Sequence, residues 1–126
     1  MEFALISMVL MTLLFGILQY GWYFYSAQSA SSVARETARR LVVGDCTAGT
    51  EARDFAASQA ALSSLDLKFG TPASMNNTLP PIGTMMRVEV SADAKILGVL
   101  PLPNGGTVTR TVDAMVEDDS ADQPCT

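Results

Sequence analysis

Residues 3–25 read FALISMVLMTLLFGILQYGWYFY and carry no charge, and the next charged residue is Arg35. An α-helix rises about 1.5 Å per residue, so this stretch would form a helix of roughly 35 Å. A bilayer core requires about 20 consecutive apolar residues, so the helix is long enough to cross one with some tilt. The alternative is a helix buried in a soluble core, which a chain of 126 residues would rarely place at its extreme end. The stretch predicts a membrane-inserted N-terminal helix.

The helical pattern continues beyond the apolar stretch. Residues 26–43 contain neither Gly nor Pro. Small or apolar residues recur there at steps of three and four along one face, namely Ala27, Ala30, Ala34, Ala38 and Leu41. Such a face lets another backbone approach closely, and on the polar face Glu36 precedes Arg40 by four residues, a favourable pairing. Because Gly44 is a typical helix terminator, we expect one helix of about 40 residues whose second half is amphipathic.

The remaining residues predict a small α+β domain. Residues 51–65 have the pattern of a short amphipathic helix with Ala52, Phe55, Ala56, Leu62 and Leu65 facing inward. Residues 70–83 are rich in Pro and Asn and predict a loop. This loop contains the sequon Asn76-Asn77-Thr78, although such triplets are common by chance, and glycosylation of Asn76 stays open.

Two strands are expected after the loop. Residues 86–91 alternate strictly, with Met86, Val88 and Val90 facing inward. A wide connection through residues 95–106 leads to a second strand at 107–116. Its inward face holds Val108, Val112, Ala114 and Val116, and Arg110 interrupts it. The strands should pair antiparallel and pack onto the amphipathic half of the long helix.

We therefore expect a pilin-like α+β fold in two parts. Residues 1–43 form a transmembrane or assembly helix that continues as an amphipathic helix. Residues 44–126 form a small extracytoplasmic domain with a short helix and an antiparallel β-sheet. Large core residues are few in the second part, so the domain would be marginally stable without a packing partner or a covalent link.

Charge and residue types exclude several functions. The net charge is −5, which argues against a nucleic-acid partner because phosphate contacts require a basic face. The chain has no histidine, so it lacks a His-based triad or an imidazole metal site. It has no glycine-rich phosphate-binding motif, and its C-terminal acidic residues lack the spacing of a calcium loop. We expect no enzymatic activity, no metal and no cofactor.

The two cysteines, Cys46 and Cys125, lie on either side of the predicted small domain. They are too far apart in sequence for a zinc knuckle. One interpretation is a disulfide that links the C-terminal tail to the end of the helix, which would imply an oxidising compartment. The other is two thiols that never meet.

Three N-terminal motifs carry a family resemblance. Glu2-Phe3-Ala4-Leu5 opens the apolar helix, Phe15-Gly16-Ile17 lies within it, and residues 34–39 read ARETAR at its exit. Together they resemble the TadE-like pseudopilins of tight-adherence (Flp, type IVb/IVc) pilus systems. The resemblance covers roughly residues 2–42, and the later half fits the family more loosely.

The resemblance implies a structural pilin or pseudopilin that assembles through its helix into, or primes, an adhesive pilus. The implied assembly residues are Glu2, Phe3, Ala4, Leu5 and Gly16. The implied partners are other pilin subunits, an inner-membrane assembly platform, a prepilin peptidase that removes a leader, and membrane lipid before assembly. In such assemblies the glutamate that Glu2 matches meets the free N-terminal amine of a neighbouring subunit. A carboxylate beside an apolar helix is costly without a cation, although the helix N-terminus also favours Glu2 by itself.

Two features leave processing and orientation open. Family members carry this glutamate after a leader that ends in glycine, whereas Met1 directly precedes Glu2, so the sequence does not predict whether or where processing occurs. Arg35, Arg39 and Arg40 follow the helix, and the positive-inside rule alone would place that side in the cytoplasm. A basic leader would remove this conflict. We expect a single-pass membrane protein with its C-terminal domain outside the cytoplasm, and an extracellular pilus as a final location.

Two other functions stay open from the sequence. The first is a secreted binding domain whose helix is a signal sequence, since Ala27-Gln28-Ser29 resembles a cleavage site. Against it, the preceding region has no positive charge and the apolar run exceeds the usual 7–15 residues. The second is a single-pass accessory protein of a secretion or pilus machine that stays in the bilayer.

Overall fold

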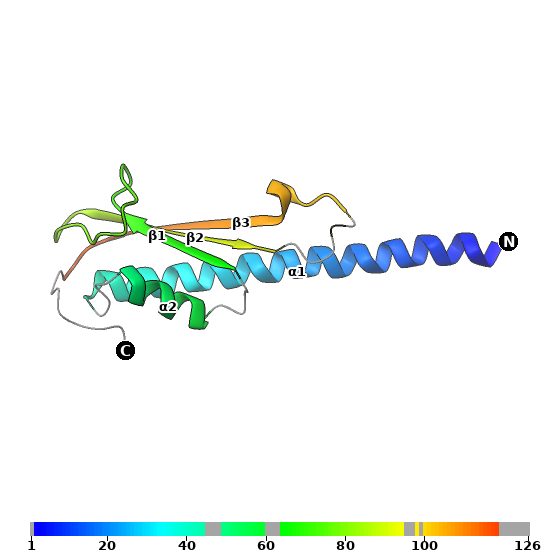
Figure 1. Ribbon diagram of the computed structural model, residues 1–126, viewed down its shortest axis with the longest axis horizontal. Coiled ribbons are helices and arrows are strands. Elements are labelled where there is room, and N and C mark those ends of the chain that lie inside the picture. Colours follow the sequence, from blue (N-terminus) through cyan, green and yellow to red (C-terminus); the bar gives the residue numbers. More distant parts are fainter. Residues whose placement is uncertain (1, 45–48, 60–63, 95–97, 99, 119–126) are drawn as a thin grey trace.

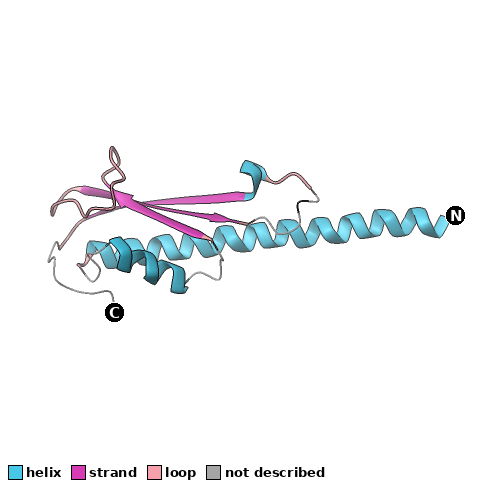
Figure 2. Ribbon diagram, viewed as in Figure 1, coloured by secondary structure: helices cyan, strands magenta, loops and turns pink. Residues whose placement is uncertain are grey.

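The computed structural model describes residues 2–44, 49–59, 64–94, 98 and 100–118 (Figure 1). Its elements are α1 (Glu2–Val42), α2 (Gly49–Gln59), β1 (Leu65–Gly70), β2 (Met85–Asp93), the 3-10 turn η1 (Pro103–Gly106) and β3 (Thr107–Met115). The strands form one antiparallel sheet in the order β1-β2-β3. The sheet and α2 lie along the C-terminal half of α1, and the N-terminal half projects beyond them (Figure 2). This is the predicted α+β fold.

The long helix is continuous, as predicted. α1 holds 41 residues and ends where Gly44 takes a φ of 76°, a left-handed conformation that favours glycine after a helix. The backbone N–H of Val43 still donates to the carbonyl of Arg39 at 3.2 Å. Arg39 and Arg40 lie in the last turn, where cations interact favourably with the helix dipole.

The alanine face of α1 forms one wall of the core. All five residues predicted for this face are buried, and they belong to the same apolar cluster as the inner face of the sheet. α1 contacts both β2 and β3. The close approach that small side chains permit is therefore used by this chain's own sheet. The domain boundary at residues 43–44 stays a prediction.

The two predicted strands are confirmed, with their inward faces. In β2, Met86, Val88 and Val90 are fully buried. On the β3 side, Val108 and Val116 are buried, and Val112 and Ala114 are half-buried. Arg110 lies opposite Val90 in the register and is exposed. Because β3 is an edge strand of the described sheet, a long cationic side chain there reaches solvent without crossing the core.

The predicted helix at residues 51–65 is wrong at its C-terminal end. α2 ends at Gln59, and Leu65 begins β1 instead. Leu67 and Phe69 of this strand are fully buried, and residues 65–70 pair along their whole length with β2. Tertiary pairing with β2 therefore overrides the local helical pattern of this segment. Ala52 and Ala56 are buried and Phe55 is half-buried, as predicted, whereas Leu62 lies outside the described residues.

The end of β1 explains why glycine occupies position 70. Gly70 has a φ of 154°, and a Cβ atom there would lie 2.4 Å from the carbonyl oxygen of Ser74. The loop that follows folds back onto the strand, since the N–H of Asn77 donates to the carbonyl of Phe69 at 2.8 Å. The predicted loop at residues 70–83 is confirmed beyond Gly70.

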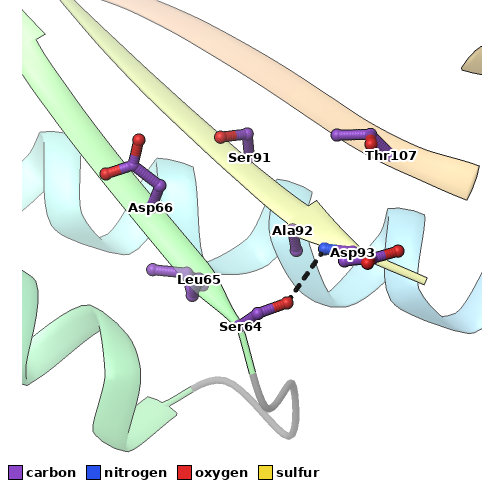
Figure 3. A pocket seen from close by; sticks show the side chains of 7 residues that line it. All are labelled: Ser64, Leu65, Asp66, Ser91, Ala92, Asp93 and Thr107. Atoms are coloured by element: carbon purple, nitrogen blue, oxygen red, sulfur yellow. Dashed lines mark hydrogen bonds between the residues drawn. The ribbon is translucent and has the colours of Figure 1, made fainter. Parts of the chain in front are cut away.

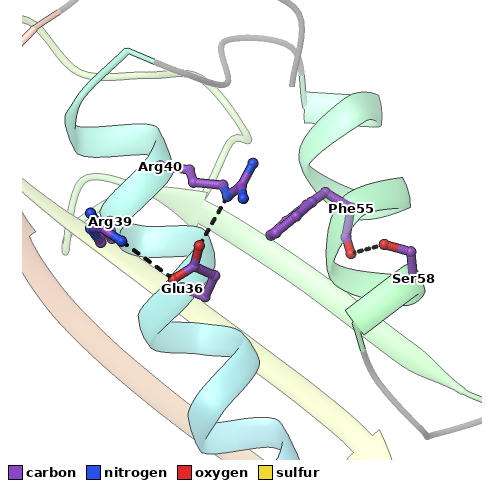
Figure 4. Close-up of polar contacts among 5 residues, drawn as sticks. All are labelled: Glu36, Arg39, Arg40, Phe55 and Ser58. Atoms are coloured by element: carbon purple, nitrogen blue, oxygen red, sulfur yellow. Dashed lines mark hydrogen bonds and ion pairs between the residues drawn. The ribbon is translucent and has the colours of Figure 1, made fainter. Parts of the chain in front are cut away.

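The two helices are joined through Arg40 (Figure 4). Its Nε donates to Oε1 of Glu36 at 3.0 Å, which confirms the predicted pairing. Its guanidinium also lies 4.2 Å from the centre of the Phe55 ring of α2, a cation–π contact. From α2, Nε of Arg53 donates to the carbonyl of Leu67 at 3.1 Å. These contacts fix α2 against both α1 and β1.

One ion pair crosses the solvent-facing side of the sheet. Arg87 and Asp113 lie directly opposite each other in the β2–β3 register. Nε and NH2 of Arg87 donate to the two carboxylate oxygens of Asp113, both at 2.7 Å, in a bidentate geometry. The hydrogen bonds from Arg87, aided by its charge, hold the pKa of Asp113 below its ordinary value, while partial desolvation opposes this shift.

This lowered pKa predicts an acid-dependent loss of stability. A carboxyl group whose pKa is lower in the folded state stabilises the fold above its unfolded pKa, about 3.9 for Asp. The contribution is lost as the pH falls through the folded pKa. We expect the stability advantage of the wild type over Asp113→Asn to be constant near neutrality and to shrink below about pH 4. Urea unfolding of both proteins at several pH values from about 2 to 7, a range that spans the titration of Asp113, measures this difference in unfolding free energy. In an Arg87→Gln background, the effect of Asp113→Asn on stability should be smaller. If the wild type kept its full advantage over Asp113→Asn at low pH, the ion pair would not be the cause of that advantage.

Candidate functional site

The N-terminal half of α1 holds most of the exposed large apolar side chains of the described residues. From Glu2 to Phe15 every side chain is exposed except that of Ser7, which is half-buried. Phe3 and Ile17 are 84% and 73% exposed. By length and composition α1 could cross a membrane, and only 6% of its most hydrophobic window is buried by the rest of the chain. A buried core helix is therefore excluded. An exposed apolar surface of this size indicates contact with lipid or with other protein subunits.

The hydroxyl groups in this segment are satisfied within the helix. Oγ of Ser7 donates to the carbonyl of Ala4 at 3.0 Å, and Oγ1 of Thr12 donates to the carbonyl of Met8 at 2.9 Å. An unpaired polar group in hydrocarbon costs several kcal/mol, so these bonds make the surface compatible with an apolar environment. The surface also holds a shallow apolar groove lined by Leu5, Ile6, Val9, Leu10 and Leu13.

The predicted assembly residues fall in two places on α1. Glu2, Phe3, Ala4 and Leu5 form the exposed first turn at the free end of the helix. Gly16 lies roughly 17 Å further along the axis from Leu5. A Cβ atom at Gly16 would lie 3.2 Å from Cδ1 of Leu100, so this glycine also accommodates a loop of the same chain.

The contact of that loop with α1 centres on Gln19, which is only 2% exposed. Its Nε2 donates to the carbonyl of Leu100 at 2.7 Å, and its Oε1 accepts from the N–H of Leu100 at 3.1 Å. The hydroxyl of Tyr20 donates to the carbonyl of Pro101 at 3.1 Å. Sequence reasoning missed this contact. The signal was a single amide side chain within the apolar run.

Both predicted disulfide cysteines, Cys46 and Cys125, lie outside the described residues. The described segments that precede them are nevertheless hydrogen-bonded to each other. The backbone N–H groups of Glu117 and Asp118 both donate to the carbonyl of Val42 at 3.1 Å. The pairing of the cysteines stays a prediction.

A second concave site lies at one end of the sheet (Figure 3). This shallow pocket is lined by Ser64, Leu65, Asp66, Ser91, Ala92, Asp93 and Thr107. Oγ of Ser64 accepts from the N–H of Asp93 at 3.3 Å, and Asp66 forms an ion pair with Lys68 at 3.5 Å. Within the described ranges, no group of three or more His, Cys, Asp or Glu residues could hold a metal ion. The candidate site is placed on α1 because of the exposed apolar side chains of its N-terminal half.

The fold and the exposed surface define a class of protein with one membrane-type helix at its N-terminus and a small α+β domain. Residues 1–39 match the family model described as TadE-like protein, which confirms the resemblance of the N-terminal motifs. The TadE-like family is associated with the tight-adherence pilus and is structural rather than catalytic. No curated protein and no solved structure matches the chain.

Proposed function

We propose that this protein is a pilin or pseudopilin subunit that assembles through α1 into, or primes, a tight-adherence pilus used for surface adhesion. The observation that carries the proposal is the exposure of the apolar half of α1, beside a second half that is integral to a folded domain. Lipid covers the exposed half before assembly, and helices of neighbouring subunits replace lipid in the filament. The shallow groove between Leu5 and Leu13 suits the side chains of such a neighbouring helix.

Glu2 has a defined part in this mechanism. It occupies the exposed first turn of α1, beside a surface that is otherwise apolar. Moving such a carboxylate among packed apolar helices is costly unless a cation neutralises it. The free N-terminal amine of an adjacent subunit is the cation that we assign to it. Phe3, Ala4 and Leu5 supply the packing surface beside Glu2, and Gly16 permits close approach further along the helix. Further partners are the inner-membrane platform and the prepilin peptidase.

The packing of α1 disfavours a cleaved signal sequence. Cleavage near Ser29 would remove Ala27 from the core and Gln19 from its hydrogen bonds with Leu100. A segment that is discarded has no need of such contacts with the mature domain. A single-pass accessory protein keeps them, so it is the competing outcome of the experiments below.

We further propose that the small domain lies outside the cytoplasm and that a Cys46–Cys125 disulfide closes it. The bonds of Glu117 and Asp118 to Val42 hold together the chain segments that lead to the two cysteines. Cys46 lies four positions after Val42, and Cys125 lies seven positions after Asp118. At roughly 3.3–3.6 Å per extended residue, both connections are long enough for the sulfur atoms to meet.

Surface filaments sheared from the native organism test the proposed function directly. We expect the helix-bearing chain in the filament fraction, with an intact mass lighter by two hydrogens than the reduced form. Immunodetection with antibodies against the small domain would follow its distribution between filaments and membranes. Finding the chain only in the membrane fraction would contradict a shaft subunit and favour the accessory protein.

Glu2→Gln tests the assigned assembly residue. We expect the fraction of the protein in filaments to fall by about tenfold or more, because the variant leaves the partner amine without its counter-charge. Membrane insertion should be unchanged, since the apolar stretch is intact. Glu117→Gln is the matched control on the exposed surface of the small domain and should assemble normally. Normal assembly of Glu2→Gln would exclude the proposed pairing.

A further inference from the structure

The loop between β2 and β3 reaches α1 within its apolar half. We call its described residues, Gly98 and 100–103, the Leu100 loop. Figure 1 shows the described end of this loop rising from α1 to η1, which leads into β3. The contact uses Gly16, Gln19 and Tyr20. The folded domain therefore contacts α1 within its apolar segment as well as along its amphipathic half.

The aromatic residues of α1 locate this contact relative to a membrane. Four consecutive aromatic residues begin two positions after Tyr20, namely Trp22, Tyr23, Phe24 and Tyr25. Trp and Tyr are enriched where lipid meets water. Residues 3–22 extend roughly 30 Å, which is about the thickness of the hydrocarbon core. Along the helix axis, Gln19 then lies about 5–9 Å deeper in the membrane than these aromatic residues.

The chemistry of the loop suits that depth. No charged residue occurs between Lys95 and Arg110. Pro101 and Pro103 are exposed, and Leu100 and Leu102 are half-buried. In lipid an unpaired backbone amide is costly, but the N–H and the carbonyl of Leu100 are both hydrogen-bonded to the side-chain amide of Gln19.

From these observations we infer that the Leu100 loop enters the outer leaflet of the bilayer beside α1, held at that depth by Gln19. The occupant of its exposed surface is lipid at the boundary between headgroups and acyl chains. The loop is thus a second membrane contact, and it sets how deeply the helix is inserted before assembly. This inference rests on the proposed membrane residence of α1.

Depth-dependent fluorescence quenching tests the inference on the full chain. The protein is reconstituted into phosphatidylcholine–phosphatidylglycerol vesicles that carry a doxyl quencher near the glycerol end of the acyl chain. Trp22 is the only tryptophan, so Leu102→Trp in a Trp22→Phe background reports on the loop alone. Pro101→Trp is a second probe at an exposed position, in case the first variant does not fold. Met115→Trp is the control, at the far end of β3 and 57% exposed.

We expect strong quenching of the loop probes and little quenching of the Met115→Trp control. If the native Trp22 is quenched and the loop probes are not, the inference is overturned while the membrane residence of α1 stands. If Trp22 is not quenched either, the proposed membrane residence itself fails. Blue-shifted emission of the loop probes without doxyl quenching would assign the loop to a protein contact and would also overturn the inference.

Gln19→Leu tests the part assigned to the amide. Combined with Leu102→Trp, it removes both hydrogen bonds to Leu100 and should reduce the doxyl quenching of the loop probe by about twofold or more. Thr12→Leu, a matched change from a polar to an apolar residue on the exposed part of α1, should leave the quenching unchanged. Unchanged quenching in the Gln19→Leu variant would contradict the holding role of Gln19.

Discussion

Replacing Ala34 with leucine is expected to lower the free energy of unfolding by about 1–3 kcal/mol. Ala34 is fully buried in the face of α1 that packs against the sheet. Leucine adds three carbon atoms to a contact that already has no free space, so α1 and the sheet must separate or side chains must leave their preferred rotamers. A small domain has a total stability of only about 5–15 kcal/mol, so the loss is a large part of it.

Urea-dependent pulse proteolysis with trypsin, in mild detergent, measures this effect. Lys68, Arg87 and Arg110 lie in the three strands and become cleavable when the sheet unfolds. The matched control is Ala57→Leu on the exposed side of α2, for which we expect a change within about 0.5 kcal/mol. If Ala34→Leu were equally neutral, α1 would not be docked on the sheet through its alanine face.

Phe69→Ala is expected to destabilise the fold by about 3–5 kcal/mol. Phe69 is the largest fully buried side chain and comes from β1, the strand that pairs with β2. Its backbone N–H donates to Oδ1 of Asn77 at 3.2 Å, which joins the following loop to the strand. Truncation leaves a cavity between the sheet and the helices and weakens the anchor of this loop.

Phe55→Ala is the control for Phe69→Ala in the same proteolysis assay. Phe55 is half-buried and stacks under Arg40, a contact worth about 0.5–1 kcal/mol at an exposed site. We expect it to cost less than half as much as Phe69→Ala. A cost for Phe69→Ala as small as that of Phe55→Ala would contradict the packing of β1 in the core.

The differences between prediction and structure have identifiable causes. The α1 boundaries, its alanine face and the inward residues of β2 followed from periodicity, because helical and strand periods are local properties of the chain. β1 did not follow, since residues 51–65 contain small and apolar residues compatible with a helix and only pairing with β2 shows where the helix ends. A strand of six residues offers too short a pattern to compete with the helical one that precedes it.

By itself, the sequence determined that this protein has a membrane-type helix with an amphipathic continuation and an α+β fold, because the distribution of charges and the helical and strand periods can be read directly from the order of the residues. Only the tertiary structure decided what the alanine face packs against and where Gln19 finds its hydrogen-bond partners. Those partners are backbone groups of Leu100, separated from Gln19 by 81 positions in the sequence. Because every residue except proline carries the same backbone N–H and C=O groups, the sequence does not indicate which of them Gln19 will bond.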